Sequence, residues 1–382
     1  MKRSLAFLMC FVLSPAGAEM GEIEITRVIG SEFPGVYKHP ASLTELSNED
    51  LYLAYYSGAG EYATDTAVYG MRLRKGAQQW SLPEVIADTP DRSEGNPVVW
   101  QAPDGIVWLF YVNRYGDTWS SSRVKAKIST DGAKTWSDSF MFAFEEGTMV
   151  RGQPIVLESG DYLLPVYHET GEDTEMTASD TSSFFFRYNP KSKAWTETSR
   201  ITSPTGNLQA QVVQLTDDYL VCYIRRGGSY EPTTTGYMLR SESHDGGQTW
   251  SEAVNTEFPN PNAAIDFIKL TNGHLLLVYN DNMNERTPLT VAISTDDDKT
   301  YPYRRNIAGG DQYLRVSLRH TDQRRQDPRH LHDQRSQNDH ASRLRRKRHP
   351  QFQLGLEIPA LSFSTFQPVF HAFPRFNRAY ID

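Results

Sequence analysis

Short apolar segments recur along the chain at a nearly constant interval. Each follows a polar turn sequence, such as Pro103-Asp104-Gly105 or Thr271-Asn272-Gly273, and a further strand-like segment precedes each turn. Paired strand-like segments joined by such turns predict one β-hairpin in each repeat. The segments begin 56, 55, 57 and 55 residues apart and span Leu51–Tyr56, Val107–Val112, Tyr162–Tyr167, Tyr219–Ile224 and His274–Tyr279.

A second marker follows the same interval and ends in an aromatic residue. Three repeats carry Ser-x-Asp-x-x-x-Thr followed by Trp or Tyr, a motif that we call the Asp-box, over Ser129–Trp136, Ser243–Trp250 and Ser294–Tyr301. The aspartate is expected to accept hydrogen bonds from turn amides, and the aromatic residue to pack between repeats. A structural role, not a catalytic one, is therefore predicted for Asp131, Trp136, Asp245, Trp250 and Asp296.

An interval of about 55 residues with about four strands and no helical periodicity is typical of one blade of a β-propeller. Five repeats are visible between residues 19 and 311. A sixth is expected to close the ring. The predicted fold class is therefore all-β, a six-bladed β-propeller.

The repeat pattern stops after about Gly310. Residues 312–350 are rich in Arg, His, Gln and Asp and show neither alternation nor turn sequences, which is typical of disordered segments. If the stretch from Gln312 onward is back-translated with permissible codons and read one base later, it can encode a sixth hairpin repeat. We therefore expect residues 312–382 to be an out-of-frame, disordered tail that disrupts the sixth blade.

The N-terminus has the pattern of a secretory signal. Lys2-Arg3 precedes the apolar run Leu5–Leu13, and Ala16-Gly17-Ala18 follows it. Charged, apolar and small-residue regions in this order predict a signal peptide over residues 1–18 and a secreted or periplasmic protein. The alternative is a buried N-terminal strand or helix. No other stretch is apolar for long enough to cross a bilayer.

Composition restricts the function classes. The formal net charge of −8 argues against a general nucleic-acid binder. The two cysteines, Cys10 and Cys222, cannot pair once a signal peptide has been removed. No Cys/His spacing suggests a metal site and no glycine-rich loop suggests a nucleotide, so no metal or cofactor is expected.

Polar residues are predicted to converge on one mouth of the propeller. The starts of the innermost strands and the ends of the strands that follow them lie on the same face, because a hairpin reverses direction. Several arginines there suit a carboxylate-bearing ligand, because guanidinium binds carboxylate in a bidentate manner. The candidate substrate-binding residues are His39, Asn96, Arg114, Arg151, Gln153, Gln209, Arg225, Asn262 and Asp266.

The loop Ser57–Asp65 carries two carboxylates over the same mouth. Glu61 or Asp65 could act as a general acid if burial or a neighbouring charge raised its pKa. Both are therefore candidate catalytic residues. The alternative for either one is a surface charge on a loop.

The Asp-boxes, the 55-residue interval and Pro261–Asp266 resemble the sialidase (BNR, Asp-box) superfamily over roughly residues 35–308. The resemblance implies an exo-sialidase-type propeller with an arginine triad for a sugar carboxylate, a Tyr nucleophile backed by a Glu, and an Asp acid/base. Asp65 matches the acid/base strand and Arg225 the second arginine. Tyr37–Pro40 corresponds to the family's first arginine motif but contains no arginine. The nucleophilic Tyr of the family is expected in the shifted reading frame, which this chain does not encode. An inactive chain is therefore one expected outcome.

Three functions remain open at this point. The first is a secreted, exo-acting glycoside hydrolase of sialidase type that removes a terminal, acidic sugar from a glycan. The second is a polysaccharide lyase or another glycosidase, in which His39, His168 or Tyr56 takes the proton. The third is a non-catalytic glycan-binding propeller, which the departure from the arginine motif permits.

Overall fold

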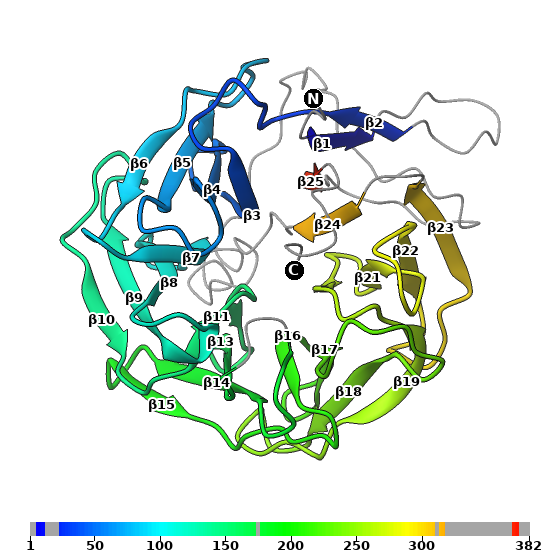
Figure 1. The fold of residues 1–382 in the computed structure, drawn as a ribbon. Coiled ribbons are helices and arrows are strands. Elements are labelled where there is room, and N and C mark those ends of the chain that lie inside the picture. Colours follow the sequence, from blue (N-terminus) through cyan, green and yellow to red (C-terminus); the bar gives the residue numbers. More distant parts are fainter. Residues whose placement is uncertain (1–4, 12–22, 173–175, 310–312, 318–368, 374–382) are drawn as a thin grey trace, which may run out of the picture.

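The computed structural model describes residues 5–11, 23–172, 176–309, 313–317 and 369–373 of the 382-residue chain. Five antiparallel sheets follow one another in chain order around a central axis, from β3 to β23 (Figure 1). The prediction of an all-β propeller is confirmed. The described residues contain no helix that is long and apolar enough to span a membrane.

The first three blades cover the chain from Tyr37 to Glu197. Blade 1 consists of β3 (Tyr37–Glu45), β4 (Leu51–Gly58), β5 (Ala67–Leu73) and β6 (Glu84–Ala87). Blade 2 consists of β7 (Ser93–Gln101), β8 (Val107–Arg114), β9 (Ser122–Ser129) and β10 (Phe140–Ala143), with a 3₁₀ helix, η1 (Trp119–Ser121), before β9. Blade 3 consists of β11 (Thr148–Val150), β12 (Ile155–Val156), β13 (Tyr162–His168), β14 (Ser182–Asn189) and β15 (Ala194–Glu197).

The last two blades cover Asn207 to Ala308. Blade 4 consists of β16 (Asn207–Gln214), β17 (Leu220–Arg226), β18 (Tyr237–Ser243) and β19 (Val254–Pro259). Blade 5 consists of β20 (Asp266–Lys269), β21 (Leu275–Asn280), β22 (Leu289–Ser294) and β23 (Tyr303–Ala308). In all five blades the strand after the turn begins within one residue of the start of the apolar segment in the sequence. These strands are β4, β8, β13, β17 and β21.

The hairpin turns share one backbone geometry, which explains the regular interval. In blades 2 and 3 the amides of Ala102 and Leu157 donate to carbonyls four residues later, at 2.8 Å each. The glycines of these turns, Gly105 and Gly160, both have φ of 86°, a left-handed conformation that glycine adopts without steric cost. The turn sequence therefore fixes where each second strand begins.

The aromatic residue at the end of each Asp-box packs on the preceding blade. Trp250 of blade 4 stacks on Phe185 of blade 3, with ring centroids 4.6 Å apart. Tyr301 of blade 5 meets Phe258 of blade 4 at 5.2 Å. Such aromatic pairs contribute about 1 kcal/mol beyond the burial of their area, so the Asp-boxes stabilise the interfaces between blades.

The Asp-box aspartates bind their own turns. Asp245 accepts hydrogen bonds from the Thr249 amide at 2.9 Å, the Thr249 hydroxyl at 2.6 Å and the Ser243 hydroxyl at 2.8 Å. Burial opposes ionisation of Asp245, but these hydrogen bonds outweigh it and lower its pKa to about 2. Asp131 and Asp296 accept the corresponding bonds from Thr135 and Thr300.

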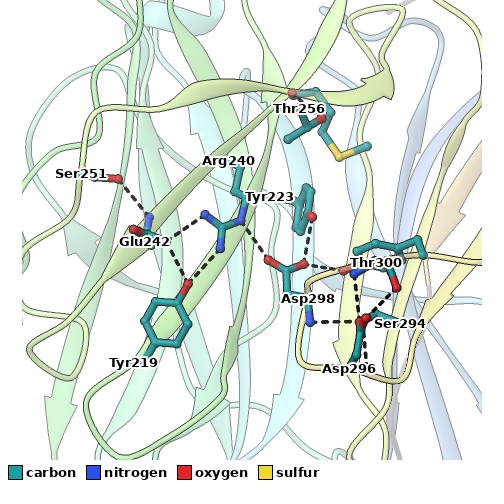
Figure 2. Close-up of polar contacts among 12 residues, drawn as sticks. Tyr219, Tyr223, Arg240, Glu242, Ser251, Thr256, Ser294, Asp296, Asp298 and Thr300 are labelled. Carbon is teal, nitrogen blue, oxygen red and sulfur yellow. Dashed lines mark hydrogen bonds and ion pairs between the residues drawn. The ribbon is translucent and has the colours of Figure 1, made fainter.

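The Asp-box of blade 5 carries an additional carboxylate that the other boxes lack. Asp298 stands where blade 2 has Ala133 and blade 4 has Gly247, and its side chain is 2% exposed. It accepts hydrogen bonds from Tyr223 at 2.9 Å, Tyr301 at 2.7 Å and Arg240 at 2.9 Å (Figure 2). Arg240 and Tyr223 belong to blade 4, so Asp298 ties the two blades together through a buried polar cluster.

The predicted sixth blade is not formed, and the prediction of a six-bladed ring was wrong in this respect. The repeat ends with β23, and the described part of residues 312–382 contributes only β24 (Tyr313–Ser317) and β25 (Val369–Phe373). These two strands pair with each other, and β25 pairs with β1 (Leu5–Phe11), which pairs with β2 (Ile23–Thr26). An antiparallel sheet built from the two ends of the chain therefore lies beside the five blades, and β24 contacts β3 and β21.

The predictions for the two ends fall largely outside the described residues. Residues 1–4 and 12–18 of the predicted signal peptide lie outside them, and Leu5–Phe11 forms a strand, as in the alternative stated above. Most of the predicted tail, residues 318–368 and 374–382, also lies outside them. Cleavage of the signal remains a prediction.

Candidate functional site

One pocket is lined by residues from all five blades, at the predicted mouth. It has a volume of about 50 Å³, below the roughly 300–1,000 Å³ of pockets that enclose a whole ligand. Its walls combine charged, amide, aromatic and small apolar groups. Its charged, amide and aromatic lining residues include His39, Glu61, Asn96, Trp119, Arg151, Tyr167, Glu169, Gln209, Arg225, Tyr230 and Arg286.

Three arginines from consecutive blades meet in this pocket. Arg151 follows β11, Arg225 lies in β17, and Arg286 lies in the loop between β21 and β22. Their exposed fractions are 7%, 8% and 5%. Burial lowers the pKa of Arg151, but a guanidinium remains charged in a protein. The sequence predicted Arg151 and Arg225 at this mouth and missed Arg286.

Neutral oxygen atoms orient Arg225. Its Nε donates to Asn262 Oδ1 at 2.7 Å, its Nη1 to Gln209 Oε1 at 3.1 Å and its Nη2 to the Tyr230 hydroxyl at 2.7 Å. These partners hold the plane of the guanidinium without neutralising its charge. The Tyr230 ring also lies 5.5 Å from the guanidinium carbon of Arg286, so Tyr230 contacts two of the three arginines.

A series of hydrogen bonds connects this arginine group to blades 2 and 3. The Tyr167 hydroxyl accepts from Asn96 Nδ2 at 3.3 Å and from Gln209 Nε2 at 3.5 Å. Burial raises the pKa of Tyr167, which keeps the phenol neutral. Asn96, Tyr167 and Gln209 therefore form a polar floor that leads to Arg225.

Three of the polar residues at the mouth have left-handed backbones. The φ angles are 41° at Asn96, 59° at Gln209 and 55° at Asn262. Asn96 and Gln209 lie where the inner strands shift register, between Gly95 and Val98 and between Leu208 and Gln211. A non-glycine residue is strained in this region and stays there only where the surrounding structure holds it. Such residues occur often at functional sites.

Blade 1 contributes one of the carboxylates that line the pocket, Glu61. Glu61 lines the pocket, and its Oε1 accepts a hydrogen bond from the buried Tyr56 hydroxyl at 2.9 Å. The His39 ring lies edge-on to the Tyr56 ring, with centroids 5.6 Å apart. The Ser93 hydroxyl donates to the Glu61 carbonyl at 2.9 Å, which fixes the loop to blade 2. Glu61, Tyr56 and His39 thus form one group within blade 1.

Asp65 lies outside this pocket. Its side chain is exposed, and its Oδ1 accepts a hydrogen bond from the Ala59 amide at 3.0 Å. Asp65 therefore stabilises the turn of the loop whose other carboxylate, Glu61, reaches the pocket. Of the two candidate catalytic residues, the geometry favours Glu61.

Four other predicted binding residues do not line the pocket. Arg114 donates to the Tyr62 carbonyl at 2.6 Å and lies over the Tyr62 ring at 4.0 Å. Gln153 donates to Ser42 Oγ and the Leu43 carbonyl at 2.9 Å each, which ties blade 3 to blade 1. Asn262 stands behind Arg225, and Asp266 interacts electrostatically with Arg151. The structure brings together His39, Glu61, Asn96, Arg151, Gln209 and Arg225.

Sequence reasoning missed Trp119, Tyr230 and Arg286, all of which line the pocket. All three lie in loops or in η1, beyond the strand ends that define the mouth. The signal that could have found Tyr230 is the Gly227-Gly228 pair, which permits a tight loop after Arg225 and Arg226. Among the described residues, no group of three or more His, Cys, Asp or Glu side chains is suited to hold a metal ion.

Comparison with solved structures finds sialidases with the same fold. A Hadza microbial sialidase is 16% identical, with a TM-score of 0.61 over 74% of this chain and 61% of the other. The NanB sialidase from Streptococcus pneumoniae is 11% identical, with a TM-score of 0.61 over 76% and 65%. The intramolecular trans-sialidase from Ruminococcus gnavus is 15% identical, with a TM-score of 0.58 over 74% and 88%.

At these identities the likeness concerns the fold. This chain spans less than two thirds of the first two proteins. No curated protein matches the sequence.

The match to a family is more direct. The BNR repeat-like domain family matches residues 49–338. The match continues past residue 311, so neither it nor the structure supports a break in reading frame at that point. Since it covers most of the chain, and the blades and Asp-boxes supply its structural basis, the protein belongs to the BNR repeat-like domain family and has a sialidase-like propeller.

Proposed function

We propose that the protein is a secreted, exo-acting glycoside hydrolase of sialidase type that removes a terminal, acidic sugar from glycans. One observation carries the proposal. Three arginines from blades 3, 4 and 5 line one pocket together with a carboxylate, Glu61. Such a site can bind an anionic group and also move a proton. The signal-like pattern of residues 1–18 supports export.

The arginines are assigned to the acidic group of the sugar. Hydrogen bonds to Asn262, Gln209 and Tyr230 hold the Arg225 guanidinium in one orientation within the pocket. Bidentate recognition of a planar carboxylate suits guanidinium better than ammonium. The related trans-sialidase from Ruminococcus gnavus was solved in complex with oseltamivir carboxylate, which supports an acidic ligand in a propeller of this kind.

The small volume of the pocket supports exo action. A pocket of about 50 Å³ can enclose part of a single sugar, and the remainder of the glycan must stay outside. A terminal residue meets this requirement and an internal one does not. We therefore assign the end of a chain to the pocket and the rest of the glycan to solvent.

Glu61 is assigned the proton transfer. It lines the pocket, and the hydrogen bond from Tyr56 at 2.9 Å fixes one carboxylate oxygen. When Glu61 is protonated, its other oxygen can give the proton to the glycosidic oxygen as the bond from the anomeric carbon to that oxygen breaks. Water then adds to the anomeric carbon, and the rest of the glycan leaves as an alcohol. Tyr56 is fully buried and acts through Glu61, so it is a positioning residue.

A second candidate function rests on His39. This residue lines the pocket and packs against Tyr56, so it could take a proton from a carbon next to a uronic acid carboxylate, as in a polysaccharide lyase. Elimination then breaks the glycosidic bond and leaves a double bond in the product. The two reactions share the arginine group and differ in the proton that moves.

The full-length chain should be tested on a fluorogenic sialoside, on aryl glycosides of uronic acids and on neutral aryl glycosides as controls. Release of the aryl group from an acidic glycoside alone, lost in Glu61→Gln, supports the hydrolase. An unsaturated product with ultraviolet absorbance, lost in His39→Ala, supports the lyase. Binding of an acidic sugar without either product would replace both with the glycan-binding function.

A further inference from the structure

Arg225 and Arg286 are both hydrogen-bonded to Asn262. The side-chain Oδ1 of Asn262 accepts from Arg225 Nε at 2.7 Å, and its backbone carbonyl accepts from Arg286 Nη2 at 2.9 Å. Asn262 is itself fully buried, and its Nδ2 donates to the Gly228 carbonyl at 3.0 Å. A single residue is thus bonded to two cationic side chains and to the loop that carries Tyr230.

The backbone conformation of Asn262 allows both contacts. Its φ of 55° is left-handed, and this turns the side chain and the carbonyl toward different arginines. Asparagine tolerates this region better than most residues, at a cost in strain. The Asn260 side chain stabilises this backbone conformation: it accepts from the Ala263 amide at 3.1 Å and donates to the Ala263 carbonyl at 2.9 Å.

We infer that Asn262 is a positioning residue that sets the spacing of Arg225 and Arg286 and thereby the selectivity of the pocket for an acidic sugar. The inference rests on the proposed function for its ligand. Its geometric part concerns the arginines alone. Two guanidinium groups hydrogen-bonded to the same rigid residue cannot move independently, so the anion they bind must fit one fixed separation.

The test compares three variants of the full-length protein. Asn262→Gly keeps the left-handed backbone and the carbonyl for Arg286 but removes the acceptor for Arg225. Asn262→Asp keeps that acceptor and serves as the rescue. Lys193→Gly is the matched control, because Lys193 has a φ of 56° and an exposed side chain away from the pocket.

The first measurement is a crystal structure of each variant without ligand. We expect Arg225 to leave its position in Asn262→Gly and to keep it in Asn262→Asp and Lys193→Gly. If Arg225 and Arg286 keep their positions in Asn262→Gly, the inference is overturned, whatever the ligand of the protein is.

The second measurement is calorimetric binding of N-acetylneuraminic acid, glucuronic acid and glucose. We expect Asn262→Gly to weaken binding of the acid that the wild-type protein prefers by about tenfold to a hundredfold, the effect of a lost hydrogen bond to a charged group. Binding of glucose should not change. Equal affinity of wild type and Asn262→Gly for the acid overturns the inference, whereas a wild type that binds neither acid overturns the proposed function instead.

Discussion

The Tyr56 hydroxyl donates a hydrogen bond to Glu61 Oε1 at 2.9 Å, and this contact carries a loop carboxylate into the pocket. Tyr56 lies in a central strand of blade 1, whereas Glu61 lies in the loop that follows. The strand therefore supplies a rigid support for a group that a loop alone would leave mobile. Asp65, in the same loop, has no such support in the pocket and faces solvent.

This relationship predicts different effects for the two loop carboxylates. Glu61→Gln should lower kcat by about 10²–10⁴-fold, the usual contribution of a general acid or base. Tyr56→Phe should lower it less, because the carboxylate remains. Asp65→Asn should leave kcat near that of the wild type, because the amide oxygen can still accept from the Ala59 amide. Steady-state kinetics of the three variants, with melting temperatures, measures this. A larger loss in Asp65→Asn than in Glu61→Gln would reverse the assignment.

The third arginine gives a second prediction. Arg286→Lys retains the charge but loses the planar fork that contacts Tyr230 and the Asn262 carbonyl. We expect KM for an acidic glycoside to rise about tenfold or more, with a smaller change in kcat. Arg304→Lys is the control, because Arg304 also lies over an aromatic ring, Phe258 at 4.8 Å, but away from the pocket. Equal effects of the two substitutions would remove Arg286 from the binding group.

Buried Glu94 predicts a pH dependence of stability. Burial raises the pKa of Glu94 to about 7, and the hydrogen bond from Asn113 at 2.9 Å lowers it only in part. Because the folded protein holds this proton more tightly than the unfolded chain, the resulting stabilisation is present below about pH 4.5 and is lost as the pH rises through about 7. The shift from 4.5 to about 7 corresponds to about 3 kcal/mol.

The matching variant is Glu94→Gln, which removes the titration. As the pH rises from 5 to 8, the free energy of unfolding of Glu94→Gln should increase relative to that of the wild type by up to about 3 kcal/mol. Denaturant unfolding at the two pH values measures the difference. Glu84→Gln, at an exposed position of β6, should follow the wild type. Parallel pH profiles for wild type and Glu94→Gln would show that Glu94 does not titrate in this range.

The polar cluster between blades 4 and 5 gives a prediction about the ring. Asp298→Ala installs the residue that blade 2 carries at this position but leaves Tyr223, Tyr301 and Arg240 without their common acceptor. The free energy of unfolding should fall by about 3 kcal/mol, because the buried hydroxyls of Tyr223 and Tyr301 lose their acceptor, whereas Arg240 keeps its ion pair with Glu242. Asp297→Ala, at the exposed neighbouring position, should change it by less than about 0.5 kcal/mol. A similar loss in both would assign the effect to the turn backbone.

The blades were predictable because their signals are local. A turn such as Pro103-Asp104-Gly105 fixes the start of β8 by its own backbone geometry, and no distant contact is needed. The sheet beside the five blades was not predictable in this way, because β25 pairs with β1, about 360 residues away in sequence. Pairing between the ends of a chain leaves no periodic pattern.

The site was predictable only as far as strand ends define it. Arg151 and Arg225 were found because they lie at the ends of hairpin strands. Arg286 was missed because it lies inside a loop, where spacing carries no information on direction. Glu61 and Asp65 could not be distinguished from sequence, since both lie in one loop. Only the folded structure shows that Tyr56 donates a hydrogen bond to Glu61.

Trp119, in η1 of blade 2, makes ligand binding measurable by fluorescence. It lines the pocket, is 9% exposed, and lies within 5.8 Å of the Arg114 guanidinium and 5.5 Å of the Tyr62 ring. A ligand entering the pocket displaces water from its indole. The protein thus carries an intrinsic optical probe at the site, and tryptophan emission can report occupancy during a titration without a label or a chromogenic substrate.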